Sequence, residues 1–238
     1  MYFYRCLHSL RALTFDLDNT LYDNTAVITR TEQELIIFLQ KYHPALQGLT
    51  LDTYQSVHQE LRKIEPEIYH DVTYWRWRSI KQVMLNAGLS ESQAYYGANN
   101  TINMVLYWRN KITVSSTTHS ILTKLSSNWP LIAITNGNAD PTAFGLSGYF
   151  SYVLRAGRNG RAKPYKDMYQ SAARLLKLPL INILHVGDDL YADINGAIGC
   201  GMQACWINNS SSNIRQIVNT TLLPHIEISR LVSLEQLL

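Results

Sequence analysis

The sequence has few cysteines, and it contains no apolar run long enough to span a membrane. The three cysteines, Cys6, Cys200 and Cys205, form no CxxC pair. Because an odd number of cysteines cannot build a complete set of internal disulfides, the composition argues against a small disulfide-stabilised secreted domain. Polar residues interrupt the N-terminal apolar stretch before a signal-peptide core is formed. We therefore expect a cytoplasmic protein that does not associate with membranes.

The sequence also lacks a strong charge imbalance and the usual patterns of zinc and dinucleotide sites. Its 21 basic and 18 acidic residues give a formal net charge of +3, and no dense basic run is present. So small a surplus argues against a nucleic-acid partner. The seven histidines show no zinc-ligand spacing, and Gly196, Gly199 and Gly201 form no GxGxxG loop after a strand. Nothing in the sequence indicates an oligomeric state.

What the sequence does contain is a series of short apolar segments that alternate with helical patterns. Runs of this kind are typical of strands buried on both faces, and their alternation with helices predicts an α/β fold with a Rossmann-like parallel sheet. His185 puts a polar residue into one of these runs. The expected strands cover residues 10–15, 131–134, 183–186 and 204–207, with a weaker candidate at 151–154, and the expected helices cover 117–125, 165–176 and 191–198.

A long segment between the first two expected strands has a different pattern. From about residue 25 to 110 we find no buried strand but three or four helical segments, one of them marked by Leu35, Ile36, Phe38 and Leu39. A parallel crossover needs far fewer residues. We therefore expect an α-helical cap domain, residues 22–111, inserted into a catalytic core made of residues 1–21 and 112–238.

Four polar motifs follow expected strands or lie in the adjoining loops, where open α/β sheets bind ligands. Their acidic residues would repel one another unless a cation offset the charge, and Mg²⁺ is the natural candidate because it prefers oxygen ligands and often shares them with phosphate. The motifs are Asp16-Leu17-Asp18-Asn19-Thr20, Thr135-Asn136-Gly137, Lys163-Pro164, and Gly187-Asp188-Asp189 with Asp193.

These residue types suit phosphoryl transfer. Asp16 is the candidate nucleophile, because an aspartate can form an acyl phosphate that divides one difficult displacement into two easier steps. Asp18 is the candidate general acid for the leaving alcohol and general base for the hydrolytic water. Thr135 would donate its hydroxyl to a phosphoryl oxygen, and Lys163 would offset the negative charge.

In order and spacing, the motifs DLDNTL, ITNG, KP and GDDLYAD resemble those of the haloacid dehalogenase superfamily. The resemblance covers almost the whole chain and implies the catalytic roles given above for Asp16, Asp18, Thr135 and Lys163. It implies that Asp16, Asp18, Thr135, Asn136 and Lys163 bind the phosphate group. It also implies that Mg²⁺ is held by the Asp16 carboxylate, the Asp18 backbone carbonyl and Asp188, with either Asp189 or Asp193 supporting these ligands.

More narrowly, three segments resemble bacterial flavin-pathway phosphatases: YDN, EPEIYHDVTYWRWRSI and LRAGRNGRAKP. This resemblance implies a small phosphate ester as substrate, namely 5-amino-6-(5-phospho-D-ribitylamino)uracil, with flavin mononucleotide and sugar phosphates as further substrates. The alternatives are a broad-specificity sugar phosphate phosphatase unrelated to flavin metabolism and a non-enzymatic phosphoacceptor or phosphate-binding protein. A dehalogenase would share the aspartate nucleophile but would not need Asp18 as an acid.

The interleaved aromatic and arginine residues of segment 74–78 have three interpretations. The segment packs inside the cap, faces a substrate, or binds nucleic acid by stacking and charge. The helical pattern favours packing inside the cap, with a role towards substrate as the second choice. Arg155, Arg158 and Arg161 likewise belong either to a solvated loop or to the binding of an anionic substrate.

Overall fold

Two units make up the computed structural model, which describes residues 1–208, 214 and 222–238. The first unit contains Met1–Asp23, Thr113–Gly137 and Pro141–Leu238, and the second contains Asn24–Ile112 and Asn138–Asp140. These limits differ from the expected ones by one or two residues at the two chain connections. They also assign the short loop Asn138–Asp140, which the sequence suggested would lie in the core, to the helical unit.

The first unit is built on a seven-stranded sheet with the order β1-β7-β6-β5-β2-β3-β4. All neighbouring strands run parallel except β1 and β7, which pair antiparallel. The mostly parallel sheet confirms the fold class. The strands are β1 Tyr2–Phe3, β2 Ala12–Phe15, β3 Leu131–Thr135, β4 Tyr152–Arg155, β5 Ile183–Gly187, β6 Gln203–Ile207 and β7 Ile226–Ile228.

The central strands are buried along their whole length, which explains their nearly unbroken apolar sequences. Strand β2 lies between β3 and β5, with Phe15 opposite Ala133 on one side and Val186 on the other. From β2 the chain builds the sheet outwards first through β3 and β4, and then in the other direction through β5, β6 and β7. This change of direction creates a switch point at the carboxyl ends of β2 and β5.

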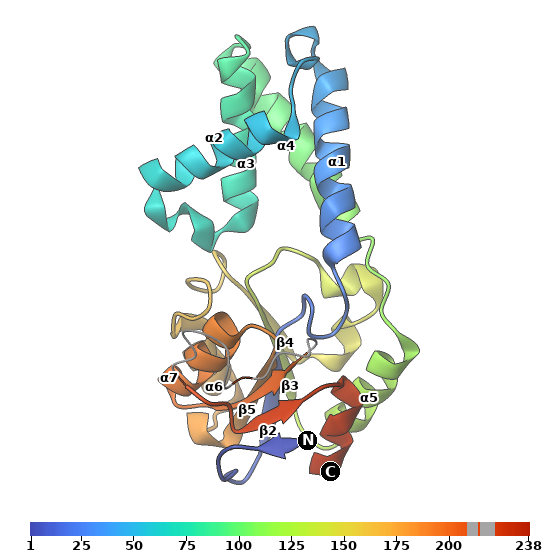
Figure 1. Ribbon diagram of the computed structural model, residues 1–238, viewed down its shortest axis with the longest axis vertical. Helices are drawn as coiled ribbons and strands as arrows, with labels where there is room; N and C mark the ends of the chain where they lie inside the picture. The colour runs from blue at the N-terminus through green and yellow to red at the C-terminus, as the bar shows by residue number, and fades with distance from the viewer. Residues whose placement is uncertain (209–213, 215–221) are drawn as a thin grey trace. The chain divides into compact units, whose positions relative to one another are not determined.

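Helices cover both faces of the sheet (Figure 1). Helices α6 Asp167–Leu176 and α7 Gly196–Cys200 lie on one face, and α5 Ser116–Ser126 lies on the other together with the 3₁₀ helix η8 Leu231–Leu237. The helix expected over 191–198 is instead a π-helix, η6 Leu190–Asn195, that continues into α7. Shorter 3₁₀ turns are η3 Pro141–Phe144, η4 Ser147–Tyr149 and η5 Leu180–Asn182.

The second unit consists of four helices joined by two 3₁₀ turns. Local capping explains where three of the helices begin, because the side chains of Thr50, Asp71 and Ser90 accept backbone N–H groups of the first turns. The helices are α1 Thr25–Tyr42, α2 Leu51–Ile64, α3 Val72–Asn86 and α4 Glu91–Arg109, and the turns are η1 Pro44–Leu46 and η2 Pro66–His70.

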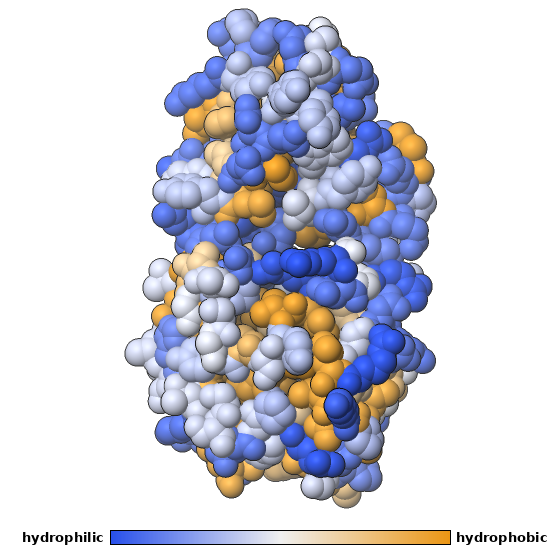
Figure 2. Space-filling view, turned by 180° about the vertical axis from the view of Figure 1, so that it is seen from behind, coloured by the Kyte–Doolittle hydropathy of each residue, from blue (hydrophilic) through white to orange (hydrophobic). Residues whose placement is uncertain are grey.

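The helical unit has its own apolar core, formed by Leu35, Leu39, Ile80 and Met84 among others. Helices α3 and α4 approach closely at Gly97, where an added Cβ would lie 2.6 Å from Sδ of Met84. On the face seen in Figure 2, the surface of this unit is largely hydrophilic, with apolar residues in separate patches. Among the described residues, none of the helices combines the length and hydropathy needed to cross a lipid bilayer.

The loop Asn138–Asp140 is bound to the ends of these helices by hydrogen bonds. The Asn138 amide donates to Oγ1 of Thr73 over 3.1 Å and accepts from Nε of Arg109 over 3.4 Å. The backbone N–H of Asp140 donates to Oδ1 of Asn110 over 2.8 Å. These contacts explain why the loop belongs to the helical unit although it directly follows Gly137.

Candidate active site

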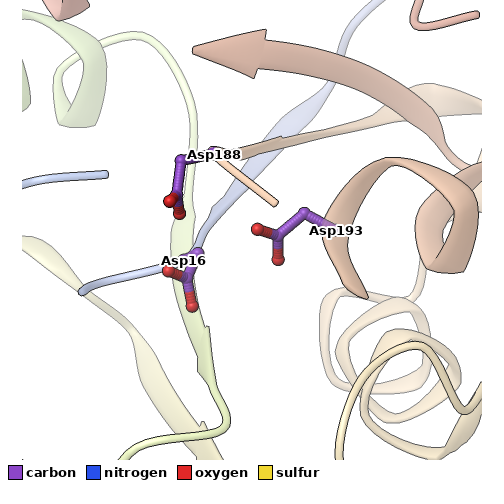
Figure 3. Close-up of side chains that lie close together, drawn as sticks. All are labelled: Asp16, Asp188 and Asp193. Atoms are coloured by element: carbon purple, nitrogen blue, oxygen red, sulfur yellow. The ribbon is translucent and has the colours of Figure 1, made fainter. Parts of the chain in front are cut away.

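Three carboxylates converge at the switch point of the sheet. Asp16 directly follows β2, Asp188 directly follows β5, and Asp193 lies on η6. Each offers an oxygen within 4.8 Å of the others, and the three side chains lie close together (Figure 3). Asp16 and Asp193 are buried, and Asp188 is half-buried. An oxygen-only group of this kind fits a hard metal cation.

A buried lysine supplies positive charge to this acidic group. Nζ of Lys163 contacts the Asp16 carboxylate, lies 2.7 Å from Oδ1 of Asp193, and donates to the Ile134 carbonyl over 2.8 Å. Burial by itself lowers the pKa of Lys163, but the charges of Asp16 and Asp193 raise it above its usual range. The lysine is therefore protonated and offsets part of the negative charge of the two carboxylates beside it.

Asp193 is held in place as an anion. Burial favours its neutral form, but Lys163 and His185 hold the pKa of Asp193 well below its usual range. Nε2 of His185 lies 3.1 Å from Oδ1 of Asp193, and its Nδ1 lies 2.8 Å from Oγ1 of Thr14. The other carboxylate oxygen of Asp193 accepts the backbone N–H of Asp189 over 3.0 Å.

The sequence left the roles of Asp189 and Asp193 open, and the structure separates them. The Asp189 side chain is exposed, and its Oδ1 accepts the backbone N–H groups of Tyr191 and Ala192 over 2.7 Å each. Asp189 therefore caps the first turn of η6. Asp193, four residues later, is the one that lies with Asp16 and Asp188.

Asp16 and Asp188 differ from Asp193 in their proton affinity. Burial raises the pKa of Asp16 well above its usual range, although Lys163 opposes this, and burial together with Asp193 raises the pKa of Asp188 to about 6. Asp188 is oriented by Oγ1 of Thr20, which donates to Oδ1 over 3.1 Å, and by Trp206, whose Nε1 donates to the Asp188 carbonyl. Carboxylates that are poorly compensated as anions are suited to binding a cation.

Gly187 leaves the room that this arrangement needs. An added Cβ would lie 2.3 Å from Cγ of Asp193, closer than real Cβ contacts allow. The glycine at the end of β5 therefore lets the Asp193 carboxyl group reach the sheet edge.

The loop after β3 supports the lysine. Oδ1 of Asn136 accepts the backbone N–H of Lys163 over 2.7 Å, and Nδ2 of Asn136 donates to the Lys163 carbonyl over 3.1 Å. Thr135 is buried at the end of β3, and its Oγ1 accepts the N–H of Gly137 over 2.9 Å. The Asn136 side chain thus fixes the segment that carries Lys163, and contact of Asn136 with phosphate stays a prediction.

Asp18 lies in a tight loop directly after Asp16. Asn19 adopts a left-handed backbone conformation with φ of 59°, which asparagine tolerates better than most residues. The Asn19 N–H donates to the Tyr22 carbonyl over 2.8 Å, and the Leu21 N–H donates to the Leu17 carbonyl over 2.9 Å. Asp18 is half-buried and close enough to raise the pKa of Asp16.

Thr20 belongs to the first motif, and the three remaining residues of the site, Thr14, His185 and Trp206, were not selected from the sequence. Only His185 gave a visible signal, because a polar residue in a fully buried strand needs a partner. Among the three arginines that the sequence left open, Arg161 forms an ion pair with Asp167, with Nε 2.7 Å from Oδ2.

Known proteins that resemble this chain are hydrolases, in keeping with the geometry of the site. A family model described as haloacid dehalogenase-like hydrolase matches residues 10–201. The chain is 54% identical over 238 residues to the Escherichia coli (strain K12) 5-amino-6-(5-phospho-D-ribitylamino)uracil phosphatase YigB, covering 100% of both chains. It is 26% identical to the Mus musculus N-acylneuraminate-9-phosphatase, covering 98% of this chain and 95% of that one.

A solved structure shares the fold closely. The 2-haloacid dehalogenase from Pseudomonas syringae pv. Tomato DC3000 superimposes with a TM-score of 0.89 at 29% identity, covering 95% of this chain and 97% of that one. The relatives thus include both phosphatases and a dehalogenase, two reactions that must be distinguished by the side chains present.

Proposed function

The chain belongs to the haloacid dehalogenase-like hydrolases, and from this premise we propose that it is a magnesium-dependent phosphomonoesterase acting through an aspartyl-phosphate. The observation that carries the proposal is the burial of Asp16 beside Lys163, within a group of three carboxylates and two residues before Asp18.

In the first step an oxygen of the Asp16 carboxylate attacks phosphorus, and the bond between phosphorus and the ester oxygen breaks. Asp18 gives its proton to the departing alcohol. In the second step Asp18 takes a proton from a water molecule that attacks the phosphorus of the acyl phosphate, which releases inorganic phosphate and restores the Asp16 carboxylate. Asp18 thus donates a proton in the first step and accepts a proton in the second.

Neighbouring groups stabilise the charge that develops on the phosphoryl oxygens. The Lys163 ammonium already lies beside Asp16, so it is in place when negative charge accumulates there. The hydroxyl of Thr135 and the backbone N–H groups that follow β3 are the donors for the phosphoryl oxygens.

Asp16, Asp188 and the Asp18 backbone carbonyl would hold Mg²⁺, and the buried anion of Asp193 supports this group through Lys163. The metal, when bound, reduces the repulsion between the nucleophilic carboxylate and the phosphate dianion. The raised pKa values of Asp16 and Asp188 support a cation site, because binding would favour their ionised forms.

Asp18 favours phosphate over a halogenated acid as substrate. A halide ion leaves without a proton, whereas an alkoxide leaves readily only when an acid protonates it. A cation held by the acidic group would offset the negative charge of a phosphate dianion. The displacement of a halide needs no such cation.

The proposed substrate is 5-amino-6-(5-phospho-D-ribitylamino)uracil, with flavin mononucleotide and sugar phosphates as weaker substrates. The support is the 54% identity to YigB over the full length of both chains. The proposed location is a reducing cytoplasm, in keeping with three free cysteines in the described part of the chain.

The test is phosphate release from these three substrate classes, each with Mg²⁺ and with a chelator. We expect release that depends on the metal and is fastest with the ribitylaminouracil phosphate. Equal rates on all sugar phosphates would instead indicate a broad-specificity phosphatase. Binding of phosphate without release would indicate a non-enzymatic role.

A further inference from the structure

The helical unit contains a polar cavity of about 770 Å³, built from residues of that unit alone. Its size lies within the usual range of small-molecule sites. Glu32 of α1, Tyr54 and His58 of α2, and Arg76 of α3 line it together with more exposed residues of α2. None of these residues belongs to the acidic site described above.

Nη1 of Arg76 is buried without a hydrogen-bond partner, and the buried Tyr54 hydroxyl, which lies near Ser79, forms no hydrogen bond of regular geometry. Tyr54 is only 3% exposed. Burial raises the pKa of Tyr54 to about 12, so its hydroxyl keeps its proton near neutral pH. Buried polar groups are almost always paired in proteins, so these two donors at one cavity call for an acceptor from elsewhere.

His58 contributes a hydrogen-bond acceptor to the cavity. Ser79 donates its single hydroxyl proton to the Trp75 carbonyl over 2.8 Å, so the hydroxyl oxygen accepts from Nδ1 of His58, 2.7 Å away. Nε2 of the neutral ring then carries a lone pair. Burial and the Arg76 charge lower the pKa of His58 to about 4, so the neutral ring prevails at pH 7.

Neighbouring groups hold the His58 ring in a fixed orientation. The Trp75 ring stacks on it with a centroid separation of 3.7 Å and an interplanar angle of 12°. Nε1 of Trp75 also donates to the His58 carbonyl over 2.8 Å. The cavity thus combines one fixed acceptor with two donor residues, a defined set of groups for recognition.

We propose that this cavity binds a uracil ring, with the imide edge of the ring on Arg76, His58 and Tyr54. That edge presents a carbonyl, an N–H and a second carbonyl, the complement of two donors and one acceptor. The choice of ring rests on the proposed function, whose substrate carries uracil. A simple anion fits less well, because the carboxylates of Glu32, Asp52 and Glu60 line the same cavity.

The test is calorimetric titration of the intact protein with 5-amino-6-(D-ribitylamino)uracil, which lacks the phosphate. We expect saturable binding, weakened about tenfold or more by Arg76→Gln and by His58→Phe, as for the loss of a buried hydrogen bond. The matched control is Arg78→Gln, two residues along the same helix. Arg78 pairs with Glu65 and does not line the cavity, so this variant should bind like the wild type.

A second probe tests the pattern without any mutation. A ligand methylated at the imide nitrogen loses the proton that His58 accepts, and it should not bind to the wild-type protein. Because both ligands are compared on the wild-type protein, the result does not depend on whether His58→Phe folds, which thermal unfolding would show. Wild-type binding of the methylated ligand with unchanged affinity would overturn the proposal.

Two further outcomes would also overturn it: no saturable binding, or binding that Arg76→Gln and Arg78→Gln weaken equally. Inorganic phosphate that binds through Arg76 and displaces the ring compound would identify an anion site instead. Phosphate release from 5-amino-6-(5-phospho-D-ribitylamino)uracil, measured on the same preparation, separates the two proposals. Release without ring binding contradicts the cavity alone, and ring binding without release contradicts the phosphatase alone.

Discussion

Lys163 is shared by two buried carboxylates, and this sharing determines how changes of single residues affect the site. Its ammonium group contacts Asp16 and lies 2.7 Å from Asp193. Removing one carboxylate leaves a lysine that is still paired. Removing the lysine leaves Asp16 and Asp193 without their shared cation, and Asp193 then keeps only His185 and the Asp189 N–H as partners. The two kinds of variant should therefore separate chemistry from stability.

Asp16→Asn should reduce phosphate release to the background rate with little loss of stability. The amide has nearly the same shape but is not a nucleophile, and Lys163 keeps Asp193 as its partner. Activity and urea unfolding of the same preparation test this expectation. Activity close to that of the wild type would show that another residue attacks phosphorus.

Asp18→Asn should slow turnover by roughly 10²-fold or more, the usual contribution of a general acid or base. The loss should shrink for esters whose leaving group is a weak base, because such a group departs without a proton. Values of kcat/KM on an alkyl and an aryl phosphate give the comparison, because they report the first step and not the later hydrolysis of the acyl phosphate, in which Asp18 serves both esters as a base. Equal losses on both esters would move the acid role to another residue.

Lys163→Met should destabilise the protein by about 3–5 kcal/mol, because it breaks a buried ion pair and leaves charged partners behind. Lys124→Met is the matched control, since Lys124 pairs with Glu235 on the surface and such pairs contribute about 0–1 kcal/mol. Urea unfolding measures both. A loss as small as that of the control would mean that Asp16 and Asp193 do not depend on the lysine.

At the scale of elements, the fully buried strands and the edge strand β4 could be predicted, whereas the short strands β1 and β7 could not. Strands β2, β3, β5 and β6 have apolar sequences because both faces are covered. Strands β1 and β7 are only two and three residues long, and they form by pairing with each other and with β6. No local pattern marks so short a strand, because its partner supplies most of its stabilisation.

The segment after β5 shows that a helix, too, could be predicted only in part from its sequence. Its periodicity predicted one helix over 191–198, whereas the structure has a π-helix followed by α7. The wider π turn accompanies the cap by Asp189 and the inward position of Asp193. Departures of this kind are common at functional sites.

Gly187→Ala should disturb the site through this element. The new Cβ would overlap Asp193, so we expect a loss of about 1–3 kcal/mol, typical of overpacking, and a lower metal-dependent rate. Gly199→Ala in α7 is the matched control, because nothing lies within 4 Å of its added Cβ. Full activity in both variants would show that catalysis does not need the close approach of Gly187 and Asp193.

At the scale of the whole molecule, the convergence of Asp16 and Asp188 could be predicted because each directly follows a strand end. Asp16, Thr135 and Asp188 reach one sheet edge through topology alone. The cavity of the helical unit could not be predicted in this way. It combines α1, α2 and α3 through packing angles that no periodicity specifies. For segment 74–78 the sequence favoured packing inside the cap, with a role towards substrate as the second choice.

His225 links the two ends of the chain and should make stability depend on pH. Its Nδ1 accepts the N–H of Ala204 over 3.2 Å, and its carbonyl accepts the N–H of Tyr4 over 3.0 Å. Burial, together with Arg5 and His8, lowers the pKa of His225 from 6.5 to about 4. Between these values the unfolded chain binds a proton that the folded chain does not, so stability falls as the pH falls from 6.5 towards 4.

Thermal unfolding between pH 7 and pH 4.5 measures this effect. His225→Phe should be less stable at pH 7 because Ala204 loses its acceptor, but its midpoint should fall less on acidification than that of the wild type. Each kcal/mol corresponds to a shift of roughly 2–4 °C for a protein of this size. Parallel curves for the two proteins would exclude His225 as a source of the pH dependence.

The loop Asn138–Asp140 has a consequence for how such proteins can be recombined. Because this loop belongs to the helical unit, the chain passes between the two units four times, after Asp23, Ile112, Gly137 and Asp140. A helical insert transplanted from a relative would therefore arrive without matched partners for Asn138 and Asp140. The exchangeable module is discontinuous, and a chimera that keeps its hydrogen bonds must take the three-residue loop along with the helices.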